Sequence, residues 1–404
     1  MNVHNSDQFS AADSALGYLY QVRCALLWSL QRLPTEPVFE VSMETLDDVT
    51  FDKAGAPQEL LQTKLHKNRG ANLTDASPDL WKTLRIWIAA LDAGKITTET
   101  VFYLVTTENT SPGSIAGNLK SVGRDTEVAL QKLLQTAQTS INPDNSKAYQ
   151  AYLNKSDDER KALVERIFIV DSAPDISDLD QLLRQEVFHA ISREHQNAFL
   201  EYLEGWWFRR SIDQLKSIDM GDRISSEELE AQMADLREQF RRESLPISHD
   251  LLNYELDDET ADSHSDFPFV QQIKLATNHT KRIASAIQDY YRAFEQRSRW
   301  QRQELLFVGD LKVYEKRLVE EWELLFAAIE DRLDDHATEG DKKAAAQEVL
   351  FWAETGNVRA RIKPEVIEPF ITRGSLHILS NEMRVGWHPE FRTRLQNLME
   401  GSGT

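Results

Sequence analysis

The sequence predicts an α/β domain built around a mixed sheet, followed by a mostly α-helical domain. Three observations support this prediction. Residues 39–65 alternate apolar and polar side chains on both sides of a turn at Gly55, which is typical of a β-hairpin. Residues 100–106 and 163–170 are continuous apolar runs of strand length, typical of strands buried on both faces. From about residue 175 onward, helical periodicity dominates.

The elements predicted for the first domain, residues 1–172, follow the order helix, hairpin, helix, strand, helices, strand. The first helix covers residues 8–33, where apolar side chains form a helical stripe that ends before two prolines. A second amphipathic helix covers residues 78–92, and shorter helices are predicted around residues 126–138 and 146–153. This order gives a mixed sheet flanked by helices, with the hairpin acids at one sheet edge.

The second domain, residues 173–404, is predicted to be mostly helical, with a small β-containing tail from about residue 355. Residues 257–266 are predicted to form an acidic linker, because they carry too few apolar side chains to bury. In the tail, residues 374–389 predict a strand, a turn at Asn381, and a short strand or loop. The predicted helices cover residues 178–191, 195–212, 225–243, 267–295 and 300–332, and the last two are expected to pack as an antiparallel pair.

The composition of the 404 residues limits the function classes. A net charge of −20 argues against a general nucleic-acid coat, because affinity for a duplex comes largely from neutralised phosphates. Residues 1–150 hold 17 acidic and 13 basic side chains, so most of the negative charge lies behind the first domain, as a partner-binding region or a solvated helical surface. Cys24 is the only cysteine, which excludes an internal disulfide and a cysteine-rich zinc site. The polar N-terminus and the absence of an apolar run long enough to span a membrane predict a cytoplasmic protein with no membrane partner.

The hairpin carries the candidate site. Folding at Gly55 brings the acidic side chains near residue 48 close to Gln62 and Lys64, which share one face of the second strand. Asp48 is the first candidate ligand for Mg²⁺ (or Mn²⁺), a hard cation that needs only one or two protein carboxylates. The second ligand is Glu44 if the first strand continues unbroken, or Asp47 if it kinks at Leu46. Lys64 would orient a water or neutralise charge on a phosphate, so the set suits metal-assisted attack on a phosphodiester.

Each candidate also has a simpler interpretation. The Asp47-Asp48 pair at a turn is often turn chemistry, and an exposed lysine on an edge strand often only discourages edge pairing. Lys67 and Arg69 are candidate DNA phosphate contacts or parts of a solvated loop. The tryptophans Trp206, Trp207 and Trp387 are candidate partner contacts or core anchors. His377 and His388 have no matching ligand set, so a structural role is favoured over a metal site.

The ordered motifs of the first domain resemble a known family. An acid pair followed by Gln-x-Lys is similar to the PD-(D/E)xK nuclease superfamily, in the variant where Gln replaces the usual acid. The segments GYLYQ, METLDDVTF, LLQTKLHK and LTDASPDLWKTLRIWIAAL together resemble the Cap4-type double-stranded DNA endonuclease domain of bacterial anti-phage systems, over roughly residues 10–170. The resemblance implies a restriction-endonuclease-like fold and a metal-dependent endonuclease whose substrate is double-stranded DNA. Asp48, Gln62 and Lys64 match the catalytic positions, with Glu44 or Asp47 as the further acid.

The second domain has a resemblance of its own. The GWWFRR run and the GSLHILSNEMRVGWHP tail resemble the C-terminal regions of effector subunits in ABC-type three-component defence systems, of which Lamassu is an example. The resemblance implies docking on an SMC/Rad50-like ATPase subunit together with a small adaptor subunit, and restraint of the nuclease until a homo-oligomer assembles. No GxxxxGK[ST] motif occurs in the chain, so ATP chemistry is expected to belong to a partner.

Three other functions compete with this expectation. The chain is also compatible with a non-catalytic DNA-binding or scaffold subunit that keeps a degenerate nuclease fold, because Gln62 departs from the acidic pattern. An RNA-directed nuclease would use the same side chains. A helical interaction protein without a nucleic-acid role is the third alternative, and the Gln62-x-Lys64 hairpin argues against it.

Overall fold

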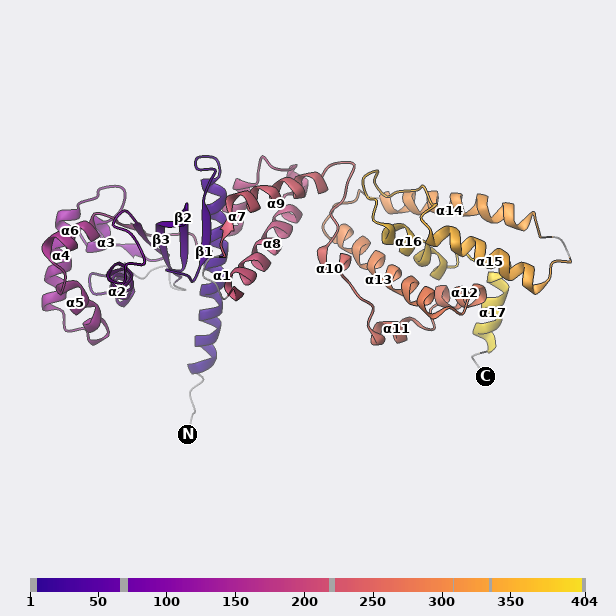
Figure 1. Cartoon of the computed structure of the whole chain (residues 1–404), viewed down its shortest axis with the longest axis horizontal. Coiled ribbons are helices and arrows are strands. Elements are labelled where there is room, and N and C mark those ends of the chain that lie inside the picture. The colour runs from indigo at the N-terminus through magenta and orange to yellow at the C-terminus, as the bar shows by residue number, and fades with distance from the viewer. Residues whose placement is uncertain (1–5, 66–71, 218–221, 308, 334–335, 402–404) are drawn as a thin grey trace, which may run out of the picture. The chain divides into compact units, whose positions relative to one another are not determined.

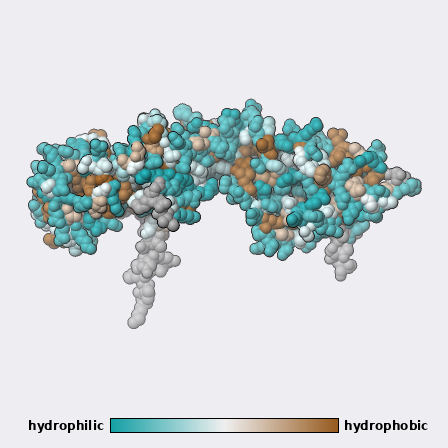
Figure 2. Space-filling view, in the orientation of Figure 1, coloured by the Kyte–Doolittle hydropathy of each residue, from teal (hydrophilic) through white to brown (hydrophobic). Residues whose placement is uncertain are grey.

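The computed structural model describes residues 6–65, 72–217, 222–307, 309–333 and 336–401. The chain forms two compact units, Met1–Asp235 and Leu236–Thr404, which Figure 1 shows as a mixed α/β part and a helical part. The predicted order of an α/β domain and a mostly helical region is therefore confirmed. Among the described helices, none is both long and apolar enough to cross a membrane. The face shown in Figure 2 is mostly hydrophilic, with hydrophobic residues in small separate patches.

A six-stranded mixed sheet organises the first unit, in the strand order β7-β5-β3-β2-β1-β8. The strands β1, β2 and β3 form an antiparallel meander, β8 pairs antiparallel with β1, and β5 and β7 continue the sheet parallel to β3. A separate parallel pair joins β4 and β6. The strands are β1 (Glu40–Met43), β2 (Val49–Lys53), β3 (Ala56–Lys64), β4 (Asn72–Leu73), β5 (Val101–Thr106), β6 (Asn109–Thr110), β7 (Ile167–Val170) and β8 (Ile224–Ser225).

The predicted hairpin corresponds to β2 and β3, in a register that pairs Val49 with Leu61. Its turn has positive φ angles of 52° at Ala54 and 78° at Gly55, the geometry of the two-residue turns that match strand twist. The stretch before the hairpin does not continue as one strand, because residues 44–48 form a turn between β1 and β2. The φ of 54° at Glu44 begins this turn.

Helices cover both faces of the sheet. On one face lies α1 (Ser6–Arg32), which packs against β1, β3 and the later helices α7 and α8. On the other face, α2 (Pro78–Asp92) buries Trp81 and Trp87 in a core that includes Leu60 and Phe102 of the sheet. The remaining helices over this face are α3 (Ile115–Asn118), α4 (Thr126–Thr139), the 3₁₀ turn η1 (Pro143–Asn145), α5 (Ser146–Leu153) and α6 (Asp157–Val164).

The strand predicted over residues 163–170 is shorter than expected. A capping box between Ser156 and Glu159 starts α6, so the residues up to Val164 are helical and β7 begins at Ile167. The division between units also lies later than the predicted boundary at 172/173, because β8 completes the sheet and α8 packs against α1. The elements that extend this unit are α7 (Leu179–Glu186), the 3₁₀ turn η2 (Arg193–His195), α8 (Gln196–Lys216) and the start of α9 (Ser226–Gln239).

The second unit is built from helices, with its closest packing between α13 and α16. Two predictions for this region differ from the structure. The acidic segment 257–266 buries no residue, as predicted, but it lies within the second unit and contains the short helix α11, which Asp257 caps by accepting a hydrogen bond from the amide of Thr260. The single helix predicted over 267–295 is broken near Thr277 into α12 and α13. The helices are α10 (His249–Leu252), α11 (Asp258–His264), α12 (Pro268–Ala276), α13 (Thr280–Arg302), α14 (Asp310–Glu330), α15 (Glu339–Glu354), α16 (Pro369–Asn381) and α17 (Phe391–Gly401).

The predicted β-containing tail is also wrong, since the described residues after 355 form helices and loops without a strand. Residues 374–380, expected as a strand, belong to α16, and all seven are buried. A helix buried on every side shows no apolar stripe, so its sequence resembles a buried strand. The prediction that the helices of residues 267–295 and 300–332 pack as an antiparallel pair is also wrong, because the main neighbour of α13 is α16, from the tail.

Candidate active site

The candidate side chains meet at the C-terminal end of β3, beside the turn formed by residues 44–48. Asp48 lies directly before β2 and is 8% exposed. Its Oδ2 accepts two hydrogen bonds from Thr63, one from the amide at 2.7 Å and one from the hydroxyl at 2.8 Å. These bonds fix the orientation of the Asp48 carboxylate, and its Oδ1 has no hydrogen-bond partner among the described residues.

Glu44 lies on the same turn, and its amide donates to the carbonyl of Asp48 over 3.2 Å. Burial raises the pKa of the Glu44 carboxyl, and the negative charge of Asp48 raises it further. A side-chain hydrogen bond from Gln21 and the positive charge of Lys64 act in the opposite direction. The structure therefore brings together Glu44, Asp48 and Lys64, with Gln21 as an additional neighbour.

Asp47 points elsewhere. Its Oδ2 accepts a hydrogen bond from the indole of Trp87 at 2.6 Å, and its Oδ1 accepts from the amide of Asp48 at 3.1 Å. Burial raises the pKa of Asp47 to about 7, with the neighbouring Asp48 charge adding to the effect. One carboxylate oxygen of Asp47 thus ties the turn to α2, and the other is bonded within the turn. The charges of Asp48 and Lys64 act on both acids that the sequence left open as the second ligand. Asp47 is held by the indole of Trp87, whereas Glu44 takes a side-chain hydrogen bond from Gln21.

Gln62 and Lys64 occupy alternate positions of β3 and so lie on one face of the strand. Gln62 is 5% exposed and pairs across the parallel ladder with Leu104, whereas Lys64 is half-buried and pairs with Thr106. The side chain of Gln62 is thus buried on β3. The next residue, Thr63, donates the two hydrogen bonds to Asp48. The predicted phosphate contacts Lys67 and Arg69 lie outside the described residues.

Two residues of α1 join this group and were not identified as site residues from the sequence. Tyr18 lies close enough to Glu44 that the carboxylate charge, after burial, raises the pKa of its phenol. The hydroxyl of Tyr18 and the Oε1 of Gln21 are buried and have no hydrogen-bond partner among the described residues. The signal in the sequence was the GYLYQ segment, where polar groups interrupt an apolar helix before the stripe that ends at Leu30.

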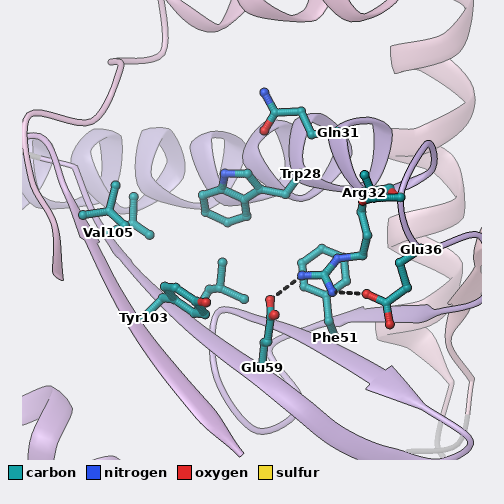
Figure 3. Close-up of a pocket in the computed structure, with 11 residues that line it drawn as sticks. Trp28, Gln31, Arg32, Glu36, Phe51, Glu59, Tyr103 and Val105 are labelled. Atoms are coloured by element: carbon teal, nitrogen blue, oxygen red, sulfur yellow. Dashed lines mark hydrogen bonds and ion pairs between the residues drawn. The ribbon is translucent and has the colours of Figure 1, made fainter. Parts of the chain in front are cut away.

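Arg32 fixes α1 on the sheet (Figure 3). Its guanidinium pairs with Glu59 of β3 and, at 2.8 Å, with Glu36, and it lies 4.2 Å from the ring centroid of Phe51. This clamp belongs to a pocket of about 450 Å³ whose walls include Trp28 and Tyr103. The pocket opens on the face of β3 opposite to Gln62 and Lys64, so it is distinct from the candidate site.

The donor set fits one hard divalent cation. Two carboxylates, Glu44 and Asp48, lie close enough to influence each other's charge, and Mg²⁺ needs no more than one or two protein carboxylates because it keeps several waters. The unpartnered Oε1 of Gln21 is a further oxygen donor at the same place. No group of three or more His, Cys, Asp or Glu side chains that could hold a metal occurs in the described parts of the chain.

The tryptophans that the sequence offered as partner contacts are mostly core residues. Trp207 is 1% exposed, and its indole donates to the carbonyl of Val22 at 2.8 Å. Trp387 is fully buried against His377, with a ring separation of 5.7 Å. Burial removes both indoles from any docking surface in this structure, whereas Trp206 is half-buried beside Trp207.

The fold and the site together define an α/β unit with a carboxylate, amide and lysine cluster at the C-terminal end of a sheet strand, joined to a helical unit. Comparison with known proteins adds information about the helical unit. Residues 269–395 match the family described as C-terminal domain 7 of the ABC-three component (ABC-3C) systems. This match extends from α12 into α17. The second unit therefore contains a region similar to a domain of these systems.

No curated protein matches the chain. Two similar solved structures are of the Acinetobacter baumannii Cap4 SAVED/CARF-domain containing receptor, with the cyclic trinucleotides 3′3′3′-cAAA and 2′3′3′-cAAA. They share 12% and 13% sequence identity with this chain, at TM-scores of 0.36 and 0.35. Each match covers 69% of this chain and 58% of the receptor chain, so this chain spans less than two thirds of the receptor's length. A similarity this low does not establish a shared fold or function.

Proposed function

We propose that this protein is a Mg²⁺-dependent DNA endonuclease effector of a three-component defence system. The observation that carries the proposal is the convergence of Glu44, Asp48 and Lys64 at the end of β3, where the charges of Asp48 and Lys64 both act on the Glu44 carboxyl. The order of the sequence motifs, which resembles the Cap4-type nuclease domain, gives independent support.

In this proposal, Asp48 and Glu44 hold the divalent cation, Mg²⁺ or Mn²⁺. The bound cation supplies Lewis-acid polarisation of a phosphoryl oxygen and lowers the pKa of a water. The two hydrogen bonds from Thr63 keep the Asp48 carboxylate oriented, so that Asp48 would hold a cation with little reorganisation. Lys64 stabilises negative charge on the scissile phosphate or orients the water, and Gln62 contributes a neutral oxygen in place of the usual acid.

We further propose that the second unit connects this nuclease to partner subunits. Its match to C-terminal domain 7 of the ABC-three component systems supports docking on an SMC/Rad50-like ATPase and a small adaptor. Cutting both strands of DNA needs two active sites or a repositioning step, so assembly of a homo-oligomer is a physically sensible activation step.

The test is plasmid cleavage in Mg²⁺ by the full chain at low and high concentration, with and without the partner subunits. Lys64→Ala and Asp48→Asn are expected to abolish cleavage, whereas Lys95→Ala, at an exposed position in the same unit, is the matched control and should cut like the wild type. Steep concentration dependence would support activation by assembly, and a labelled RNA duplex would reveal an RNA-directed enzyme. If the wild type binds DNA but does not cut it under any of these conditions, the proposal fails and the scaffold function replaces it.

A further inference from the structure

A pocket of about 390 Å³ in the second unit concentrates positive charge in an acidic protein. Four cationic side chains line it, and only two carboxylates offset them, Asp289 and Glu354. The lining therefore carries a formal excess of two positive charges. The cations are Lys281, Arg282, Arg292 and Arg373.

Each of the three arginines is held by partners through Nε and Nη2. Arg282 donates hydrogen bonds from both nitrogens to the carboxylate of Glu354, over 2.8–3.0 Å. Arg373 does the same to the carboxylate of Asp289, and its Nε lies 2.6 Å from Oδ2. Arg292 donates to two backbone carbonyls, those of Leu251 and Leu252, and its guanidinium lies 4.0 Å from the ring centroid of Phe370. The two carboxylates are thus already engaged, and they orient the guanidinium groups.

The remaining nitrogen of each guanidinium, Nη1, takes no part in these hydrogen bonds. The Nη1 atoms of Arg282 and Arg373 have no hydrogen-bond partner among the described residues, and Nη1 of Arg292 lies 3.9 Å from Asp289, beyond hydrogen-bond range. Lys281 adds an exposed ammonium group at the rim. Pre-oriented guanidinium donors lose little conformational freedom when an anion binds, which favours anion binding at this place.

A buried imidazole also lines the pocket. His377 is 2% exposed, and its Nδ1 has no hydrogen-bond partner in the described parts of the chain. Burial and the positive charge of Arg373 lower the pKa of His377 to about 3, so the ring is neutral at physiological pH. A neutral imidazole offers one more hydrogen bond in the pocket without altering its charge.

We infer that this pocket, between α13, α15 and α16, binds a small ligand with at least one doubly charged phosphate group. A phosphate matches the excess of two positive charges, whereas a single carboxylate matches only one of them. Hydrogen bonds from charged guanidinium nitrogens to phosphate oxygens are stronger than those between neutral groups, and the volume is within the range of small-molecule sites. The phosphate could be inorganic or part of a nucleotide, because the lining side chains recognise the phosphate group itself. This inference is independent of the nuclease proposal, since none of its residues belongs to the first unit.

Isothermal titration calorimetry on the full chain tests this inference, with inorganic pyrophosphate and ATP as probes. Binding of either probe is expected, and Lys281→Ala should weaken it about tenfold, the effect of losing one charge-assisted contact. Arg373→Lys, which keeps the charge but removes the Nη1 donor, should also weaken it. Lys316→Ala removes an equally charged side chain that is 77% exposed on α14, and it should leave the affinity unchanged.

The two probes separate the sources of the phosphate. Equal affinity for pyrophosphate and ATP indicates that phosphate alone is read, and tighter binding of ATP indicates a nucleotide. Absence of binding for both probes overturns the inference. Binding that Lys281→Ala and Arg373→Lys leave unchanged also overturns it, because the anion would then sit elsewhere. Binding of a poly-glutamate peptide in place of both probes would assign the pocket to an acidic protein segment and would equally contradict the inference.

Discussion

Replacement of Gly374 by alanine is expected to separate the two helices that form the centre of the second unit. Gly374 lies where α16 crosses α13, and a Cβ at this position would overlap the carbonyl oxygen of Asp289. It would also lie 2.5 Å from the Cβ of Ala293 and 2.7 Å from the carbonyl carbon of Asp289. These are backbone and short side-chain atoms, and Ala293 is fully buried, so no flexible group can move aside.

The cost follows from the distance that the helices must move. Ordinary carbon contacts lie near 3.5–4.0 Å, so α16 has to shift by about 1 Å away from α13 to accept the methyl group. A gap of 0.5–1 Å already removes about a quarter to a half of the dispersion energy of each facing contact. Overpacking in cores typically costs about 1–3 kcal/mol. Because α13 and α16 share the most extensive contact among the described helices, we expect a loss of about 3 kcal/mol.

Hydrogen–deuterium exchange of the full chain measures this loss of stability locally, as the exchange rates of the backbone amides of α13 and α16. A loss of about 3 kcal/mol corresponds to exchange more than a hundred times faster for the most protected amides of these helices. Gly205→Ala is the matched control. Gly205 lies in α8, and no atom lies within 4 Å of the position that a Cβ would take there, so alanine should stabilise the first unit by about 0.5–1 kcal/mol. Protection of α13 and α16 that stays at the wild-type level in Gly374→Ala would refute the proposed close packing.

Three further outcomes are expected. Arg32→Ala leaves two carboxylates without their shared cation and should lower the free energy of unfolding of the first unit by about 2 kcal/mol in urea titrations. Asp47→Ala leaves the buried indole of Trp87 without an acceptor; it should cost about 1–3 kcal/mol and change the near-UV circular dichroism, while cleavage per folded molecule stays closer to wild type than in Asp48→Asn. The lowered pKa of His377 means that below pH 6.5 the unfolded chain binds a proton that the folded chain does not. Stability from this group is therefore lost as the pH falls, by about 2 kcal/mol at pH 5, and His377→Gln should flatten the dependence of urea midpoints between pH 7 and pH 5.

The first unit could be predicted closely because its signals are local. Alternation on both sides of Gly55 specifies β2 and β3, and the helical stripe of residues 78–92 gives α2 with the predicted bounds. The break between β1 and β2 was harder, because it depends on a positive φ at Glu44, a residue type that rarely adopts this conformation. Apolar alternation on both sides of residues 44–48 resembles one strand as much as two.

The second unit was predicted less well because its signals are not local. Nearly every residue of α16 is buried, so neither a helical nor a strand period can be read from its sequence. The partner that buries it, α13, lies about 80 residues earlier in the chain. The glycine that permits this contact is visible as a residue type, but its role depends on where Asp289 and Ala293 lie in space.

The candidate site shows the same distinction between local pattern and long-range contact. The sequence placed Asp48, Gln62 and Lys64 together, because a hairpin register follows from alternation and one turn. It left Glu44 and Asp47 open as the second ligand, and the difference between their surroundings depends on Trp87, which lies 40 residues after Asp47 and donates its indole N–H to the Asp47 carboxylate. With Asp47 engaged by α2, the turn presents Glu44 toward Gln21 and Lys64. The packing of α2 on the sheet thus holds one of the two candidate acids, and a substitution at Trp87 should perturb the turn that carries both acids as well as the core.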